Sequence, residues 1–384
     1  MKILYHHRTA ADDGQAVHIR ELQSAFRRLG HEVREVALVT RSKPGQAHQR
    51  SMLGTLADWA PRFVRELAEH GYDLVGARAL RSAIAEQRPD LLYERYALST
   101  ACGATVAREL KIPYVLEVNS PLVDEVSRTR GLSFAGIARR KELKVLRTAT
   151  LVAVVSGALR DWVLSCGVER SRIVLTPNGV DRERFAPRPK SAELLQRLDL
   201  AGKVVIGFTG FVRDWHRLDL ALDAIAKARL ATRGAVLLVV GEGPALEGLR
   251  KHAEALGLSD AVHFTGKVDH KDMADYVRLI DIALVTAINP YASPLKLFEY
   301  LAVGAASVVV DQPNLREIVD EQAARFFPQG DAEALARSLE ELVLDPAVRT
   351  AIGQSGRALL LERDYTWDGN VRRVISALKK ATFP

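Results

Sequence analysis

The chain has 384 residues, a mass of 42.3 kDa and a formal net charge of +7. Hydrophobic residues make up 48% and charged residues 26%, which excludes a disordered or collagen-like chain. The length exceeds what one hydrophobic core usually supports, so we expect two domains. The only cysteines, Cys102 and Cys166, are too few for a disulfide framework and indicate reduced thiols.

Short apolar runs alternate along the chain with longer amphipathic segments, a pattern typical of parallel sheets covered by helices. In the first half the predicted strands are Lys2–Tyr5, Val33–Val39, Asp90–Tyr93, Tyr114–Val118, Leu151–Val155 and Ile173–Leu175. Helices are predicted over Gln15–Leu29 and Leu98–Leu110. After the turn-rich stretch TPNGVDRERFAPRPK, the strands resume at Val204–Thr209, Val236–Val240, Val262–Phe264, Ile282–Thr286 and Ser307–Val310.

The alternation therefore predicts an α/β protein of two Rossmann-like domains with a ligand site in the cleft between them. Two common nucleotide sites are not expected. The first strand leads to the single Gly14 rather than to G-x-G-x-x-G, and no P-loop motif occurs. The final segment, YTWDGNVRRVISALKK, predicts an amphipathic helix with no strand after it, which could cap either domain.

Positive charge is concentrated in the first half of the chain. Residues 1–180 hold 27 Lys and Arg against 19 Asp and Glu, whereas residues 181–384 hold 27 against 28. The densest part, residues 128–147, mixes basic residues with apolar ones such as Phe134 and Ile137. Such a segment can lie on an anionic membrane, bind an anionic substrate or form a solvated face. Nucleic-acid binding is not expected, because no recognition motif accompanies the charge.

No signal peptide and no run of about 18 apolar residues is visible in the sequence. We therefore expect a cytoplasmic protein, with peripheral contact at the inner face of the membrane as an option.

The stretch SPLKLFEYLAVG predicts a helix that binds an anion at its start. Ser293 suits the N-cap position and Pro294 the first helical position. The first-turn amides attract an anion, to which Lys296 adds a positive charge. A lysine here opposes the helix dipole, so stability alone does not favour it. Glu299, one turn later, could reach a ribose. The alternative is that Lys296 and Glu299 are ordinary surface residues that bind no ligand.

With these stretches in view, the chain resembles the family 4 glycosyltransferases, a group of retaining enzymes with the two-domain GT-B fold. The resemblance covers nearly the whole length. It rests on several motifs in a specific order: DGQAVHIRELQSAFRRLGHEV, PYVLEVNSP, TPNGVDRERFAP, VVGEGPALEGL, SPLKLFEYLAVG and DQPNLREIV.

The resemblance implies two domains that face each other across a cleft, with the terminal helix crossing back to the N-terminal domain. Residues 1–185 with 365–384 would bind the acceptor, and residues 186–364 the nucleotide sugar. Gly14 would lie near the transferred sugar and the diphosphate. Ser293, Leu295 and Lys296 would hold the diphosphate and Glu299 the ribose. The base and sugar would lie near Gly241, Gly243, Lys267 and Val268.

The chain departs from this family in its carboxylates and cations. Many relatives carry a glutamate where this sequence has Tyr291, and its loss favours a same-face reaction in which the departing diphosphate takes the acceptor proton. Phe211 and His216 stand where relatives have Arg and Lys, so we assign the second diphosphate cation to Arg213 and consider His216 either a substitute or a solvated turn residue. We expect no metal, because no Asp-x-Asp or histidine cluster is visible.

A third departure concerns the sugar and the acceptor. Asn119 stands where relatives have a histidine, and we predict that it contacts the sugar; the alternative is a turn residue at the end of the strand. Glu117 is expected to point to the opposite face if the strand persists. His18 is either an acceptor contact or an exposed helix residue. Asp12 and Asp13 are further acceptor candidates.

These features predict a retaining glycosyltransferase that moves a sugar from a nucleoside-diphosphate sugar, with UDP the expected nucleotide, to a hydroxyl acceptor. That acceptor could be a glycolipid, a polysaccharide or a small glycoside. No cofactor is expected beyond the donor substrate. The alternatives are a non-catalytic sugar-nucleotide-binding protein and a GT-B sugar-nucleotide epimerase. The missing glutamate and histidine disfavour the epimerase.

Overall fold

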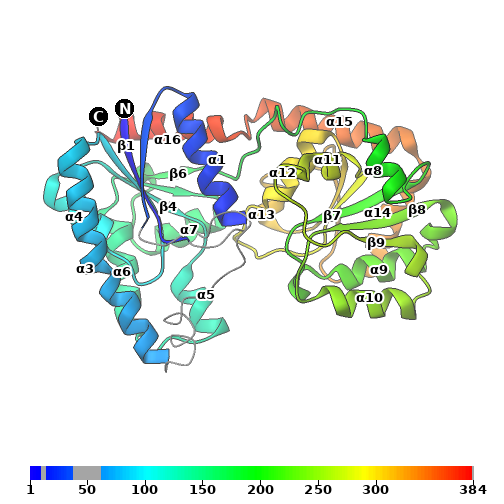
Figure 1. Ribbon diagram of the computed structural model, residues 1–384, viewed down its shortest axis with the longest axis horizontal. Coiled ribbons are helices and arrows are strands. Elements are labelled where there is room, and N and C mark those ends of the chain that lie inside the picture. The colour runs from blue at the N-terminus through cyan, green and yellow to red at the C-terminus, as the bar shows by residue number, and fades with distance from the viewer. Residues whose placement is uncertain (10–13, 38–61, 383–384) are drawn as a thin grey trace. The chain divides into compact units, whose positions relative to one another are not determined.

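The structure, a computed structural model, describes residues 1–9, 14–37 and 62–382. The chain forms two compact units, Met1–Pro177 with Asn370–Pro384, and Asn178–Gly369. Each unit contains one six-stranded parallel sheet with helices packed against it (Figure 1). The predicted domain boundaries, at 185/186 and 364/365, both fall inside the second unit.

The first unit has the strand order β2-β1-β3-β4-β5-β6. Its strands are β1 (Lys2–His6), β2 (Glu32–Val36), β3 (Leu91–Arg95), β4 (Tyr114–Val118), β5 (Leu151–Val154) and β6 (Ile173–Leu175). Its helices are α1 (Gly14–Arg28), α3 (Arg62–Gln87), α4 (Cys102–Leu110), α5 (Leu122–Thr129), α6 (Ala135–Thr148), α7 (Gly157–Ser165) and most of α16 (Trp367–Thr382). The predicted return of the terminal helix to the N-terminal domain is confirmed.

The second unit has the strand order β12-β11-β10-β7-β8-β9. Its strands are β7 (Val204–Thr209), β8 (Ala235–Val240), β9 (Val262–Phe264), β10 (Ile282–Val285), β11 (Ala306–Val310) and β12 (Ala324–Phe327). Its helices are α8 (Ala192–Arg197), α9 (Leu218–Lys227), α10 (Leu246–Ala255), α11 (Met273–Arg278), α12 (Leu295–Val303), α13 (Pro313–Arg316), α14 (Ala332–Leu344) and α15 (Pro346–Glu362).

The central strands are buried along their whole length, because helices cover the sheets. Every residue of β4, β8, β10 and β11 is buried. This explains why the strands read in the sequence as continuous apolar runs rather than as alternating ones. The predicted α/β class and the two Rossmann-like units are confirmed.

Each predicted strand overlaps an observed one, although residues 38 and 39 of the second lie outside the described residues. The predicted helix Leu98–Leu110 is wrong at its start, since α4 begins at Cys102. Ser99 adopts a left-handed backbone conformation with φ of 61°, which a right-handed helix cannot include. The short strand β12 was not predicted.

Helix α15 packs closely against the end of α12 at a glycine. A Cβ atom on Gly353 would lie 2.1 Å from the carbonyl oxygen of Gly304. Backbone atoms cannot move aside as a flexible side chain can, so this position requires glycine. In contrast, a Cβ atom on Gly248, at an exposed position of α10, would meet nothing within 4 Å.

We therefore expect Gly353→Ala to destabilise the protein by about 1–3 kcal/mol, because overpacking pushes α15 away from α12. The melting temperature should fall by several degrees in circular dichroism. Gly248→Ala is the matched control and should be neutral or stabilising by up to ~1 kcal/mol, since alanine favours a helix. Equal melting temperatures for the two variants would contradict this packing.

Candidate functional site

The candidate site of the second unit lies at the carboxyl ends of its central strands. The strand order reverses between β7 and β10, and ligands of such sheets bind outside the carboxyl ends at this reversal. The loops after β7 and β8 and the start of α12 meet there. Helix α12 is held to the end of β7 because the buried hydroxyl of Tyr300 accepts a hydrogen bond from the backbone N–H of Thr209 at 2.8 Å.

Two predicted donor-site glycines allow these loops to approach each other. Gly241 and Gly243 have φ values of 136° and 159°. A Cβ atom on Gly241 would lie 2.1 Å from the carbonyl oxygen of Gly210, and one on Gly243 would lie 2.0 Å from that of Val212. Side chains at either position would separate the loops that follow β7 and β8. The two glycines are therefore required to form this edge.

Helix α12 begins at Leu295, with Pro294 as its N-cap residue. The prediction that Ser293 is the N-cap and Pro294 the first helical residue is therefore wrong by one position. The Ser293 hydroxyl does not cap the helix; it accepts the backbone N–H of Asn178 at 2.9 Å, and its carbonyl accepts the Asn178 side-chain amide. No side chain of this fully described unit caps α12. Its first-turn amides thus lack side-chain partners.

Lys296, in the first turn of α12, is half-buried next to the glycine that ends β7. Its Nζ would lie 3.4 Å from a Cβ atom on Gly210, and it sits 3.5 Å from the centre of the Phe208 ring. Burial lowers the pKa of Lys296 to about 7, although Glu299 acts in the opposite direction. The ring contact also favours the charged form. The site therefore holds a cation that is poorly solvated.

His216 lies beside both predicted diphosphate cations and is itself uncharged. Its pKa is lowered to about 3, first by burial and then by the charges of Lys296 and Arg213. His216 is buried, and its Nδ1 accepts the backbone N–H of Arg213 at 3.3 Å. It is thus neither a substitute cation nor a solvated turn residue. Arg213 is exposed, with its guanidinium 4.9 Å from the Phe211 ring.

The remaining predicted donor residues occupy the same edge of the sheet. Gly241 forms an isolated bridge with Gly266, which places the exposed Lys267 and the half-buried Val268 beside the end of β8. Glu299 lies one turn after Lys296 and interacts with it electrostatically. The structure therefore brings the predicted donor set of the second unit together around one edge.

Two buried asparagines position the loop before α12, and sequence reasoning missed both roles. Asn178 bonds Ser293, as described above, while the side-chain amide of Asn314 donates to the carbonyl oxygens of Asn289 and Ala292 at 3.2 and 2.7 Å. Both lie in family motifs, NGVD and DQPNLREIV. Their presence in those motifs was the only signal, since neither role depends on local spacing.

In the first unit, Asn119 and His18 both contact the buried carboxylate of Glu117. The Asn119 amide donates to Glu117 at 2.6 Å, and the His18 ring nitrogen lies 3.1 Å from it. The expectation that Glu117 points away from Asn119 is wrong, because β4 ends at Val118 and the Asn119 amide turns to hydrogen-bond Glu117. Burial alone would raise the pKa of Glu117, but His18 and Arg95 lower it far below its usual range.

His18 is only 5% exposed, so the alternative of an exposed helix histidine is wrong. Gly14 is the exposed first residue of α1. The acceptor candidates Asp12 and Asp13 lie outside the described residues. Roles for these residues in acceptor binding remain predictions.

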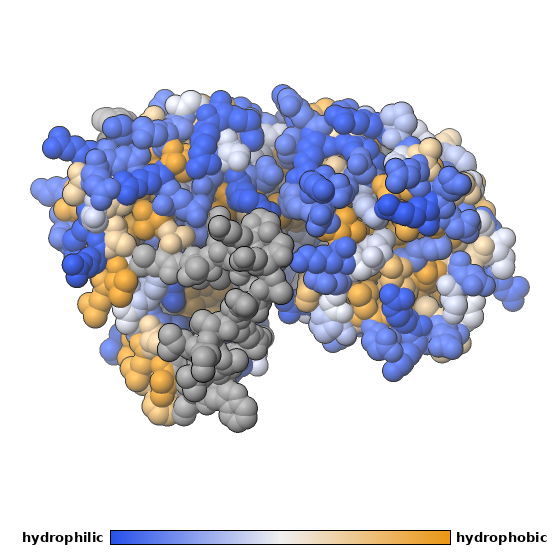
Figure 2. All heavy atoms as spheres, in the orientation of Figure 1, coloured by the Kyte–Doolittle hydropathy of each residue, from blue (hydrophilic) through white to orange (hydrophobic). Residues whose placement is uncertain are grey.

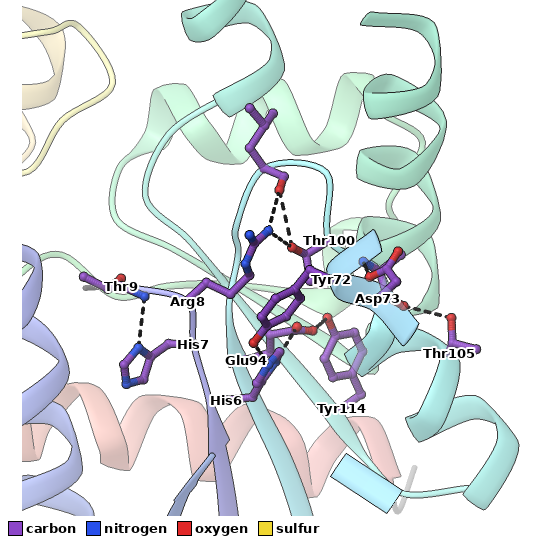
Figure 3. A network of polar contacts seen from close by, with 12 residues as sticks. His6, His7, Arg8, Thr9, Tyr72, Asp73, Glu94, Thr100, Thr105 and Tyr114 are labelled. Carbon is purple, nitrogen blue, oxygen red and sulfur yellow. Dashed lines mark hydrogen bonds and ion pairs between the residues drawn. The ribbon is translucent and has the colours of Figure 1, made fainter. Parts of the chain in front are cut away.

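A second buried polar network lies where the order of the first sheet reverses, between β1 and β3 (Figure 3). His6 pairs with Glu94 at 2.7 Å and hydrogen-bonds the Tyr72 hydroxyl at 3.2 Å, and Tyr114 donates to Glu94. Arg8 lies over the Tyr72 ring, with 4.0 Å between its guanidinium carbon and the ring centre. Sequence reasoning missed this network, because its members are far apart in the chain.

His6, Glu94 and Cys102 could offer three metal-ligand atoms within 4.8 Å of one another. Their arrangement does not require a metal. Both ring nitrogens of His6 already have hydrogen-bond partners. Burial, together with Glu94, raises the pKa of the Cys102 thiol well above its usual value, so the sulfur is protonated. A metal prefers a thiolate, so we interpret the cluster as a hydrogen-bonded core.

The lowered pKa of Lys296 predicts a pH-dependent gain in stability for Lys296→Met. The unfolded pKa is near 10.5 and the folded pKa near 7, so the unfolded state binds more protons between these values and wild-type stability rises with pH across this window. The methionine variant should be more stable by about 1 kcal/mol below pH 7.

Melting temperatures of both proteins at pH 6, 7.5 and 9.5 measure this difference, which should shrink as the pH rises. A difference that does not change with pH, or a less stable variant, would show that Lys296 is well solvated.

Two family models match the sequence. The model for Glycosyltransferase Family 4 matches residues 13–184, and the model for Glycosyl transferases group 1 matches residues 192–359. The two matched regions follow the two structural units closely.

Curated relatives include a 2-deoxystreptamine N-acetyl-D-glucosaminyltransferase of Streptomyces fradiae, 27% identical over 67% of this chain and 63% of the relative. A D-inositol 3-phosphate glycosyltransferase of Streptomyces avermitilis is 27% identical over 69% of this chain and 60% of its own length. The chain thus matches less than two thirds of the length of these relatives.

Solved structures share the fold over the full chain. HepE of Anabaena, determined in complex with UDP, has a TM-score of 0.74 and 17% identity, covering 99% of this chain and 100% of that one. Sucrose-phosphate synthase of Thermosynechococcus elongatus has a TM-score of 0.75 and 18% identity, with coverages of 100% and 99%. Both halves of the sequence match glycosyltransferase models and both units have the corresponding fold, so the chain belongs to the family 4 glycosyltransferases.

Proposed function

We propose that the chain transfers a sugar from a nucleoside-diphosphate sugar to a hydroxyl acceptor with retention of configuration. The observation that carries this proposal is the start of α12, where uncapped amides and the poorly solvated Lys296 face the same edge of the sheet. A diphosphate is the group that both features favour. The charge of Lys296, which is unfavourable in the empty site, becomes favourable when an anion is bound.

The diphosphate is held by Lys296, the amides of α12 and the exposed Arg213. Arg213 and Lys296 both lie close enough to His216 to lower its pKa, which supports their action on one ligand. Because its Nδ1 accepts the Arg213 N–H, the neutral His216 carries its proton on Nε2 and can donate a hydrogen bond there without adding charge. Glu299 is in reach of the ribose hydroxyls on the same nucleotide.

The base and sugar lie along the loops after β8 and β9, near Gly241, Gly243, Lys267 and Val268. Here the two glycines let the loops after β7 and β8 approach each other, which forms the edge along which the base lies. We expect UDP as the nucleotide. A GDP-mannose-dependent mannosyltransferase of Mycobacterium tuberculosis is 26% identical over 62% of this chain and 64% of its own length, whereas HepE was determined with UDP. The donor must therefore be tested directly.

Retention follows from a same-face reaction in this proposal. Glu299 is the only carboxylate between Asn289 and Gly304, and the position of the family's first glutamate is Tyr291. A double displacement requires a carboxylate behind the reacting carbon. The departing diphosphate oxygen instead takes the proton of the acceptor hydroxyl, while Lys296 and Arg213 stabilise the charge that develops on it.

The first unit supplies contacts to the transferred sugar and to the acceptor. Asn119, oriented by its bond to Glu117, donates to or accepts from sugar hydroxyls, and Gly14 lets the start of α1 approach the sugar. His18 acts by holding Glu117 and Asn119 in place. Asp12 and Asp13 are proposed to contact the acceptor itself.

A membrane-linked acceptor is supported by the exposed face of α3. Five apolar side chains on this helix are at least 41% exposed: Phe63, Val64, Leu67, Leu74 and Val75. Figure 2 shows apolar surface along this helix. The basic segment 128–147 is less suited, because α6 buries Val145 and Leu146. Within the described residues, no helix is long and apolar enough to span a membrane.

The diphosphate assignment predicts that Lys296→Ala lowers turnover at least about 100-fold, the usual effect of removing one stabilising group at a developing charge. The assay offers UDP-glucose, UDP-N-acetylglucosamine and GDP-mannose with candidate acceptors such as 2-deoxystreptamine and inositol phosphate, and measures nucleoside diphosphate release. Lys251→Ala is the control, since Lys251 is an exposed lysine on α10; its turnover should stay within about twofold of wild type.

Full activity in Lys296→Ala would end the diphosphate assignment. Binding of a donor with no transfer to any acceptor would instead favour the non-catalytic alternative.

The membrane proposal predicts that more protein floats with vesicles containing phosphatidylglycerol than with phosphatidylcholine alone, because residues 1–180 carry an excess of positive charge. A double variant, Leu67→Ser with Leu74→Ser, should lose most of this binding, because it removes apolar area from α3. Leu344→Ser is the matched control, since Leu344 is 57% exposed on α14 of the second unit. Equal flotation of the double variant and the control would contradict the role of α3.

A further inference from the structure

The second unit contains a basic cavity that the proposed reaction does not use. It has a volume of about 410 Å³ and lies at the amino ends of β10 and β11, beside the last residue of α12 and one face of α15 between Arg349 and Arg357. Its charged lining residues are Arg188, Lys190, Arg278, Asp281, Arg349 and Arg357. We infer that this cavity binds a small phosphorylated anion.

The charge of the cavity is opposite to that of the unit around it. Residues 178–369, all described, hold 23 Lys and Arg against 28 Asp and Glu. The cavity nevertheless gathers five cationic side chains and a single carboxylate. A solvated basic face would be expected in the basic first unit rather than here, so the concentration of positive charge points to an anionic ligand.

The single carboxylate is already neutralised by protein groups. Asp281 pairs with Lys190 at 2.7 Å and accepts the backbone N–H of Val205 at 2.9 Å. Arg278 is paired with Asp275, outside the cavity, at 2.6 Å. Neither pair leaves negative charge for the remaining arginines.

Three arginines of the cavity have no carboxylate partner within the second unit: Arg188, Arg349 and Arg357. Arg349 donates to the carbonyl oxygens of Leu342 and Val343 at 2.6 and 3.3 Å, and Arg357 donates to that of Ala302 at 3.3 Å. These bonds cap the carboxyl ends of α14 and α12. Capping alone could therefore explain the presence of Arg349 and of Arg357.

Capping does not use the full capacity of these arginines. A guanidinium has five N–H groups, so both side chains keep donors for a ligand. Arg188 is exposed on the connecting segment and makes no hydrogen bond or ion pair in this unit. Arginine forks match the oxygens of a phosphate group in geometry and charge.

The cavity is separate from the proposed donor site. Helix α12 begins next to Lys296 and ends at Val303, which lines the cavity. Nine residues of helix span roughly 13 Å, so one anion cannot occupy both places. The volume is within the range of small-molecule sites and is more than a lone phosphate needs. A small metabolite with one or more phosphates, or a phosphorylated lipid headgroup, fits both observations.

This inference does not rest on the proposed function. The test therefore distinguishes binding in the cavity from binding at the donor site. Inorganic pyrophosphate is titrated by calorimetry into Lys296→Ala, in which the donor site is disabled. A protein that carries Arg188→Gln and Arg357→Gln in addition to Lys296→Ala should bind pyrophosphate at least tenfold more weakly than Lys296→Ala itself. A matched double variant, Arg229→Gln with Arg337→Gln, removes the same charge from the same unit outside the cavity and should bind within twofold of its parent.

A second arm distinguishes the sources of the phosphate. Vesicles of phosphatidylcholine with 10% phosphatidic acid are co-sedimented with the same proteins. Binding of pyrophosphate that is lost only in the cavity variant supports a free metabolite. Vesicle binding lost only in the cavity variant, without pyrophosphate binding, supports a headgroup.

Two results would overturn the inference: neither probe binds the parent protein, or the cavity and control variants bind equally. Loss of the Arg357 bond could unfold the end of α12, so melting temperatures accompany each titration. Arg188→Gln alone decides the question if the double variant is unstable, because the exposed Arg188 supports no other group. It should bind the probe several-fold more weakly than the parent.

Discussion

The poorly solvated cation at the start of α12 is the interaction on which the rest of the second unit's site depends. A lysine in the first turn opposes the helix dipole, and burial makes its charge more unfavourable still, which the lowered pKa of Lys296 records. An unfavourable buried charge of this kind is typical of a functional site, where a bound ligand of opposite charge makes it favourable. The surrounding groups are consistent with this interpretation, because His216 stays neutral and Glu299 offsets only part of the charge.

The geometry of this site is maintained by buried polar groups rather than by apolar packing alone. Asn178 and Asn314 hold the loop before α12 from two separate segments, and Tyr300 ties the helix to β7. Hydrogen bonds of this kind fix direction as well as distance, whereas apolar contacts tolerate sliding. The loop can therefore present its amides without a side-chain cap, which would compete with an anion for them.

In the first unit, two buried carboxylates orient the polar side chains around them. Glu117 is surrounded by His18, Arg95 and Asn119, and Glu94 by His6 and Tyr114. A buried carboxylate is tolerated only when paired and hydrogen-bonded. Both lie at the carboxyl ends of adjacent strands, so they hold the side chains around them in fixed orientations. Asn119 gains a defined direction in this way, as its proposed contact with the sugar requires.

Hydrophobic periodicity alone determined the fold class and nearly every strand, because buried parallel strands are continuous apolar runs whatever lies around them. The motif SPLK was enough to predict the start of a helix to within one residue. Tertiary structure decided the rest. Ser293 turned out to bond Asn178, 115 residues away in sequence, so local capping preference could not place the helix start. His216 became buried, and the His6 network formed, only when distant strands paired. Local patterns record propensity and periodicity, whereas the burial, pKa and partners of a polar group depend on segments that the sequence does not place side by side.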